Sequence, residues 1–204
     1  MKTKLITLIL LFVYLSFSAQ DNCGTPTPST VFNPTIPSSS TSKTVPGPFC
    51  INMRFNIVRR TNGTGGFDPA NINELVDRIN RDFLPNGISV QSIGVSFINN
   101  DALFDADGDA EHNTLFNTNN AENAINCYLV NSASLGGRAL AGRAQSIVSR
   151  NFLVTNDRAR TSTSSHELGH CLNLLHTHET AFGVEAINGS NCSSAGDRVC
   201  DTPA

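Results

Sequence analysis

Four stretches of the chain have the hydrophobic pattern of β-strands. In residues 49–57 apolar side chains occupy every second position, which is the period of a strand with one buried face. Residues 88–98, 125–130 and 147–154 form the other three stretches, each rich in apolar and β-branched side chains. The pattern therefore predicts a sheet built from strands that are well separated in the sequence.

A helix is predicted between the first two strands. Asp68 is suited to cap it and Pro69 to fill its first position, where no backbone N–H is needed. Pro85 and Gly87 end the helical pattern, whose apolar face comprises Ile72, Leu75, Val76, Ile79 and Phe83. The order of strand, helix, strand and further strands predicts an α/β fold with a mixed sheet.

The most informative pattern lies in residues 166–176, which read His-Glu-Leu-Gly-His-Cys-Leu-Asn-Leu-Leu-His. On a helix, His166 and His170 project from the same side, so two imidazoles can reach one metal ion. A straight helix would carry His176 about 9 Å past His170, so the chain must turn back before it. Asn173 stands where the turn is needed, and asparagine enters the left-handed conformation more readily than most residues.

The opposite face of this second helix is apolar, which predicts that it packs on the core; it comprises Leu168, Cys171, Leu172 and Leu175. Five hydroxyl residues, 161–165, precede the helix. We expect the helix to begin near Thr161. The alternative is a cap at Ser164, which would engage Glu167 in a capping box and withhold it from catalysis.

Three neutral histidines with a fourth position open to water form the catalytic type of zinc site. We therefore predict that His166, His170 and His176 bind zinc. Glu167 is the predicted catalytic base, which takes a proton from a zinc-bound water and passes it to the leaving amine. His178 is expected to have a supporting or surface role, because the third position is already filled. The competing interpretation is a helix whose histidines bind no metal.

Two motifs resemble those of a known family. Residues 166–176 resemble the extended zinc motif of the metzincin metalloproteases, with Asn173 in place of the usual glycine. Residues 196–204, Gly-Asp-Arg-Val-Cys-Asp-Thr-Pro-Ala, are similar to the G-D-x-V-x-D-T-P-A stretch of the pappalysin (cytophagalysin) family. The resemblance covers residues 125–204. It implies a twisted sheet backed by two long helices and a secreted zinc endopeptidase that hydrolyses peptide bonds.

The chain departs from this family after the third histidine. Metzincins place a methionine turn beneath the zinc, whereas the two methionines here are Met1 and Met53. We therefore expect residues 49–204 to be a catalytic domain truncated at its C-terminus, with the lower subdomain largely missing. The alternatives are an inactive secreted zinc-binding module or fragment, and a zinc hydrolase that is not a peptidase.

Calcium is a second candidate metal in this resemblance. Pappalysin-like enzymes bind calcium near the zinc site, which makes Asp197, Asp201 and Thr202 candidate oxygen ligands. A structural turn fixed by Pro203 is the alternative. The alternating carboxylates of residues 105–109 do not match a calcium-binding EF-hand and predict a hairpin or surface loop.

Glycines between the third and fourth predicted strands lie in a region that could form part of a substrate-binding cleft. In metzincins a strand beside the cleft pairs with the substrate backbone. We call this strand the rim strand. The resemblance implies that the region of Gly136, Gly137 and Gly142, or the region after it, forms the rim strand.

The N-terminal part of the chain predicts export and then a linker. Residues 1–19 combine Lys2 and Lys4 with an apolar run and small residues, which is the pattern of a secretory signal peptide, and the run is short for a bilayer span. Residues 20–48 are rich in Pro, Ser and Thr and predict an exposed linker or a short pro-segment. We expect an extracellular protein with no membrane partner after signal removal.

Secretion makes the six cysteines candidates for disulfides. Cys171 is expected to be a small core residue instead. Cys50 and Cys127 fall in two predicted strands and are one candidate pair, whereas Cys192 and Cys200 are candidates for partners outside this sequence.

Cys23 begins the sequence Cys-Gly-Thr-Pro. Its thiolate could occupy the fourth zinc position and keep the enzyme latent, as in related secreted metalloproteases. A disulfide or a free thiol is the alternative.

Composition adds limits on the partner. The chain has 204 residues, 39% of them hydrophobic, and a net charge of −3, which suits one domain with a core. Because there is no basic footprint, we expect no nucleic-acid partner. The predicted partner is a protein or peptide substrate, and the sequence specifies neither the cleavage site nor the oligomeric state.

Overall fold

The computed structural model describes residues 23–27, 29, 49–200 and 202. The predicted signal peptide and most of the predicted linker lie outside this part of the chain. Among the described residues, no helix is both long enough and apolar enough to cross a membrane.

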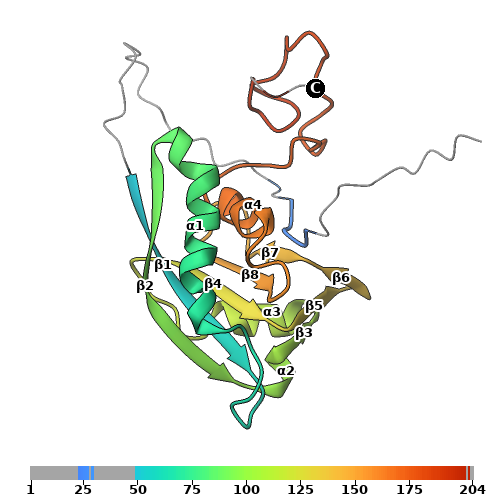
Figure 1. The fold of residues 1–204 in the computed structure, drawn as a ribbon. Coiled ribbons are helices and arrows are strands. Elements are labelled where there is room, and N and C mark those ends of the chain that lie inside the picture. The colour runs from blue at the N-terminus through green and yellow to red at the C-terminus, as the bar shows by residue number, and fades with distance from the viewer. Residues whose placement is uncertain (1–22, 28, 30–48, 201, 203–204) are drawn as a thin grey trace, which may run out of the picture.

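Five strands form the main sheet in the order β2-β1-β4-β8-β7 (Figure 1). β1 (Phe49–Arg59) pairs in parallel with both β2 (Ile88–Asn99) and β4 (Ile125–Val130). β4 pairs in parallel with β8 (Asn151–Thr155), and β7 (Gly142–Ala144) runs antiparallel to β8 at the edge of the sheet. The prediction of a mixed sheet is confirmed.

Two helices cover one face of this sheet (Figure 1). α1 (Ile72–Phe83) follows a short 3-10 turn, η1 (Pro69–Asn71). The Asp68 carboxylate caps this turn by accepting a hydrogen bond from the Ala70 N–H at 3.0 Å. α4 (Ser162–Cys171) is the helix that carries the histidine motif. The fold is therefore α/β, a twisted mixed sheet backed by two helices.

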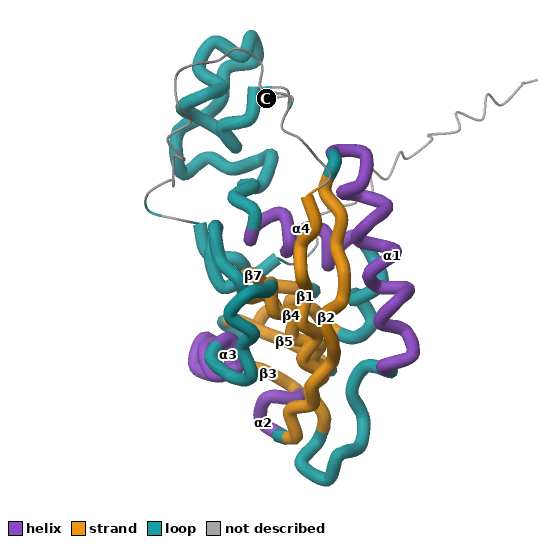
Figure 2. Tube along the Cα trace, turned by 90° about the vertical axis from the view of Figure 1, so that its left-hand side faces the viewer, coloured by secondary structure: helices purple, strands orange, loops and turns teal. Residues whose placement is uncertain are grey.

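The other face of the sheet is covered by shorter elements. α3 (Gly108–Phe116) and α1 lie on opposite sides of the sheet (Figure 2). A second sheet has the order β3-β5-β6, with β3 and β5 parallel and β5 and β6 antiparallel. The remaining bounds are η2 (Leu84–Asn86), α2 (Asp101–Phe104), β3 (Asp105–Asp107), β5 (Ser132–Leu135) and β6 (Arg138–Leu140).

The apolar core consists of two clusters, one on each face of the main sheet. One cluster lies between the sheet and the helix pair α1 and α4, and includes Phe55, Leu75, Ile79, Phe152 and Leu168. A second cluster lies beneath α2 and α3, and includes Phe104, Leu115, Phe116, Tyr128 and Leu153. Because β4 and β8 contribute side chains to both clusters, their residues are buried on both faces, as expected for central parallel strands. These buried strands give α4 a rigid support.

Three local predictions were wrong. The fourth strand begins at Asn151 and not at residue 147, because Val148 adopts a left-handed backbone with φ of 57° that a strand cannot accommodate. Residues 105–109 form β3 and the start of α3 instead of a hairpin or surface loop. Leu175 lies beyond the end of α4, so the helical spacing that placed it on the buried face does not apply there.

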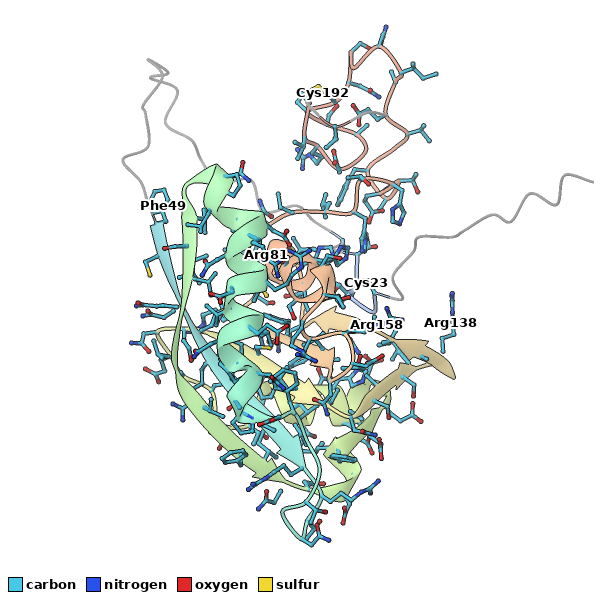
Figure 3. The ribbon with its side chains drawn as sticks, viewed as in Figure 1. Cys23, Phe49, Arg81, Arg138, Arg158 and Cys192 are labelled. Carbon is cyan, nitrogen blue, oxygen red and sulfur yellow. A yellow bond between two sulfur atoms is a disulfide. The ribbon has the colours of Figure 1, made fainter. Side chains whose placement is uncertain are left out.

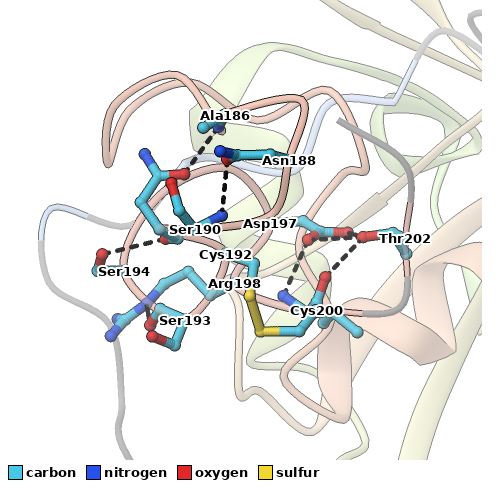
Figure 4. Close-up of a disulfide and its surroundings, with 12 residues drawn as sticks. Ala186, Asn188, Ser190, Cys192, Ser193, Ser194, Asp197, Arg198, Cys200 and Thr202 are labelled. Atoms are coloured by element: carbon cyan, nitrogen blue, oxygen red, sulfur yellow. Dashed lines mark hydrogen bonds between the residues drawn. A yellow bond between two sulfur atoms is a disulfide. The ribbon is translucent and has the colours of Figure 1, made fainter.

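The cysteines also differ in part from their predictions. Cys50 is exposed and Cys127 is buried, and both are free thiols, so they do not form the suggested pair. Cys171 is a buried free thiol in the core, as predicted. Cys192 and Cys200 form a disulfide with each other, so neither needs a partner elsewhere (Figure 4). The two cysteines are 8 positions apart, in a segment where the described residues after α4 have neither helix nor strand.

Candidate metal centre

The start of α4 leaves Glu167 available for chemistry. Thr161 caps the helix, and its hydroxyl accepts a hydrogen bond from the Thr163 N–H at 3.2 Å. The Ser164 hydroxyl instead donates to the Ala159 carbonyl at 2.7 Å. The predicted start near Thr161 is therefore confirmed, and the alternative capping box at Ser164 is wrong.

The chain reverses direction directly after α4. The helix ends at Cys171, and Asn173 adopts a left-handed conformation with φ of 78°, as predicted. The Leu174 carbonyl then lies 2.7 Å from His170 Nδ1 and accepts its proton. That hydrogen bond leaves the lone pair of His170 on Nε2, the atom that faces the other histidines. The turn thus brings the third histidine back and selects the tautomer of the second.

The three predicted ligands meet at one point. The Nε2 atoms of His166 and His170 are 3.0 Å apart, those of His170 and His176 are 3.2 Å apart, and those of His166 and His176 are 3.3 Å apart. Each ring therefore presents its outer nitrogen to the same small volume. Three imidazole nitrogens converging at this spacing are an arrangement that a shared cation stabilises.

The spacing fits zinc. Nitrogen ligands lie about 2.0–2.1 Å from zinc, so in a tetrahedral site neighbouring nitrogens are roughly 3.3 Å apart. The observed separations of 3.0–3.3 Å agree with this value. Burial lowers the pKa of His170 to about 4, with a further contribution from His166. Burial likewise lowers the pKa of His176 to about 4, with contributions from His170 and His178. Both rings are thus neutral near pH 7, the form that binds a metal.

Cys23 lies against the three histidines. Its Sγ is 3.5 Å from His170 Nε2 and 3.8 Å from Glu167 Oε2. A thiolate about 2.3 Å from zinc would be roughly 3.6 Å from a histidine nitrogen in the same tetrahedron. The ligand atoms of Cys23, His166, His170 and His176 all lie within 4.8 Å of one another, and among the described residues they form the one such metal-binding group. Cys23 thus stands at the fourth corner that the sequence left open.

The thiol of Cys23 is protonated unless a cation is nearby. Burial raises its pKa to about 12, and the Glu167 carboxylate adds to the increase. A bound divalent cation reverses this preference, because a coordinating thiol gives up its proton. With zinc bound, the Cys23 sulfur would be a thiolate ligand. Without a metal, it is an ordinary protonated thiol.

Glu167 is fully buried beneath the edge strand β7. A Cβ added at Gly142 would lie 2.7 Å from Glu167 Oε1 and 2.8 Å from its Cγ, so no larger residue fits there without displacing the carboxylate. Gly142 does not have a positive φ, so the glycine provides space and not backbone freedom. The resemblance predicted a rim strand in the region of Gly136 to Gly142 or after it. In the structure, the strand beside Glu167 is β7.

A polar cluster, in which Arg143 and His112 are buried and Asp109 is exposed, anchors β7 from the face opposite Glu167. Arg143 in the middle of β7 is 2.7 Å from His112 Nδ1 and forms an ion pair with Asp109 at 2.8 Å. His112 is fully buried, and its Nε2 lies 3.3 Å from the Ala106 carbonyl. These residues tie the rim strand to α3. Sequence reasoning missed them because they are not close in the chain and match no motif.

His178 is outside the ligand group. It is exposed, and its ring stacks on that of His176 with centroids 5.0 Å apart. This is the supporting position that the sequence suggested, because stacking restricts the orientation of the third ligand.

In the described part of the C-terminal motif, hydrogen bonds close a turn around Asp197 (Figure 4). The buried Asp197 carboxylate accepts hydrogen bonds from the Val199 N–H at 2.9 Å and from the Thr202 hydroxyl at 3.0 and 2.9 Å. Asp201 lies outside the described residues. The Asp197 and Thr202 oxygens are thus used within the turn, and the described residues do not support a calcium site.

Comparisons with known proteins give remote structural neighbours only. No family model matches the chain, and no curated protein does. Metalloproteinase-II from Bacteroides fragilis is 12% identical with a TM-score of 0.41 over 76% of this chain. Archaemetzincin from Archaeoglobus fulgidus, in complex with malonate, is 11% identical with a TM-score of 0.42 over 66% of this chain and 87% of its own. The chain spans 48% of the Bacteroides protein.

Proposed function

We propose that this chain is a secreted zinc-dependent endopeptidase of the pappalysin type of metzincin, held here in a latent form. The observation that carries the proposal is the convergence of three histidine Nε2 atoms within 3.3 Å of one another, beside a buried glutamate and the edge of a sheet. Residues 196–204 are the reason for choosing the pappalysin type.

His166, His170 and His176 would hold the metal. When bound, zinc supplies a Lewis acid that polarises a peptide carbonyl and makes a nearby water more acidic. Glu167 takes the proton of the attacking water and delivers it to the leaving amine. The burial of Glu167 keeps its carboxylate out of bulk solvent, and Gly142 provides the space for it.

The edge of β7 supports a peptide as the substrate. β7 is bonded to β8 on one side, and its other side presents the Gly142 carbonyl and the Ala144 N–H. These two groups bind Gly24 N–H and the Thr25 hydroxyl in the structure. A backbone acceptor and donor spaced along an edge strand suit an extended peptide, whereas an ester or a sugar offers no matching ladder.

The test compares zinc content and cleavage of an unfolded protein in variants that all carry Cys23→Ala, which removes the thiol from the site. We expect about one zinc per chain and cleavage that a chelator abolishes. Glu167→Ala should lower the rate at least about 100-fold, in the range expected for loss of a catalytic base. Glu122→Gln, a change at an exposed glutamate, is the matched control and should have little effect.

Two results would contradict the proposal. Zinc binding without any cleavage would favour the inactive zinc-binding module. Cleavage that survives Glu167→Ala would remove the assigned mechanism.

A further inference from the structure

Residues 23–27 lie along β7 at the metal centre (Figure 3). Cys23 forms a parallel bridge with Gly142, and the Gly24 N–H donates to the Gly142 carbonyl at 3.0 Å. An added Cβ at Gly24 would lie 2.5 Å from a Leu140 methyl group, so the segment packs closely on this edge. We call residues 23–27 the clamp segment.

Thr25 makes a contact that no sequence pattern predicts. Its hydroxyl accepts a hydrogen bond from the Ala144 N–H at 2.7 Å and donates to Glu167 Oε2 at 2.9 Å. A hydroxyl has a single proton, so this pairing of one donor and one acceptor defines its orientation. The Thr25 oxygen therefore bridges the rim strand and the predicted catalytic base.

Cys23 and Thr25 contact different parts of the site. The Cys23 sulfur lies at the histidines, and the Thr25 N–H lies 3.4 Å from that sulfur. The Thr25 side chain points the other way, to the carboxylate and to β7. Neither of these Thr25 side-chain contacts involves a metal. A metal-free protein would retain them.

We propose that Thr25 is a second autoinhibitory contact, which keeps the clamp segment in the cleft independently of the bond between Cys23 and the metal. It rests on the proposed endopeptidase function, because it assigns the regulation of that same site. The Thr25 hydroxyl hydrogen-bonds to the Glu167 carboxylate, which the attacking water must reach. It also hydrogen-bonds to the Ala144 N–H, which a substrate backbone would use. Removal of the Cys23 thiol alone therefore leaves the site partly blocked.

The contact at Thr27 provides an internal comparison. Its hydroxyl donates to Glu179 at 3.1 Å, but this hydrogen bond is exposed to solvent. Exposed hydrogen bonds contribute little, because water replaces them at almost no cost, whereas a partly buried bond to a carboxylate contributes more. Thr27→Val is thus a matched control for Thr25→Val within the same segment.

The first experiment measures kcat/KM for a peptide substrate in the zinc-loaded full chain. The variants are Cys23→Ala, Thr25→Val and the double variant. We expect the double variant to exceed Cys23→Ala by roughly 10- to 100-fold, the factor set by a hydrogen bond to a charged group. Thr25→Ser keeps the hydroxyl and should match the parent. Thr27→Val should change the rate by less than about 3-fold.

The second experiment does not depend on peptidase activity. It measures the rate at which a thiol reagent labels Cys23 in the chelator-treated full chain, at one pH, with Cys50→Ser present to remove the other accessible thiol. Thr25→Val should accelerate labelling by about 10-fold or more, and Thr25→Ser and Thr27→Val should not.

The two experiments separate the two proposals. Faster labelling in a chain that never cleaves peptides would support the clamp and contradict the endopeptidase. The clamp proposal is overturned if Thr25→Val leaves the labelling rate unchanged. It is also overturned if the chain cleaves peptides and Cys23→Ala alone is as active as the double variant.

Discussion

The residue that most tightly constrains the centre, apart from the ligands, is a glycine. Gly142 lies on the rim strand where a single methyl group would fall 2.7 Å from the Glu167 carboxylate. Atoms at that distance overlap, so the carboxylate or the strand would have to move. The buried glutamate and the glycine are thus a matched pair, and the requirement for glycine is one of space.

Gly142→Ala tests this pairing. We expect zinc binding to persist, because no ligand is changed, and kcat to fall roughly 10- to 100-fold with a smaller change in KM, because the base moves relative to the attacking water. Zinc content and steady-state kinetics in the Cys23→Ala background measure both quantities. Gly169→Ala is the control, since its nearest neighbour is a flexible Leu174 methyl group at 3.4 Å. Equal losses in both variants would show a general helix or strand effect instead.

At the scale of elements, β7 is the feature on which the site depends. It is only three residues long, yet it holds the clamp segment on its outer edge and covers Glu167. Its position is fixed by β8 on one side and by the polar cluster of Arg143, His112 and Asp109 beneath it. Short edge strands have few hydrogen bonds of their own, so this cluster adds to the anchoring that β8 provides.

The cluster predicts a dependence of stability on pH. Burial lowers the pKa of His112, and the Arg143 guanidinium lowers it further; Asp109 and Glu111 act in the opposite direction. Because the folded-state pKa is below the unfolded value of about 6.5, the stabilisation is complete above that value and is lost as the pH falls through the folded pKa. Urea unfolding between pH 7.5 and 5 should show this loss, and His112→Gln should reduce its slope. An unchanged slope in the variant would contradict this role.

At the scale of the whole molecule, the sequence predicted the features that depend on residues close together in the chain. Strand alternation located β1, β2 and β4, and the histidine spacing with Asn173 predicted the turn and the convergence of the three histidines. The sequence could not predict the contacts made across long separations. Thr25 and Glu167 are 142 residues apart, and Arg143 and His112 are 31 apart, and neither pair follows any local period. The disulfide between Cys192 and Cys200 was missed because cysteine spacing does not determine connectivity.

The arrangement as a whole is a candidate metal centre assembled from three distant parts of the chain. α4 and the turn after it supply the histidines, β7 supplies the rim, and the clamp segment supplies a sulfur and a hydroxyl. Cys23 is a free thiol beside the three histidines, so the disulfide alternative is wrong, and the latency interpretation stays a prediction. The central claim is therefore that zinc in the full chain has three histidine nitrogens and the Cys23 sulfur around it.

X-ray absorption at the zinc edge tests this claim most directly. In the zinc-loaded full chain we expect three nitrogen scatterers with histidine ring signals at about 2.0 Å and one sulfur at about 2.3 Å. In Cys23→Ala the sulfur should be replaced by a light atom while the three histidines remain. A spectrum without histidine signals, or with a sulfur that persists in Cys23→Ala, would contradict the account.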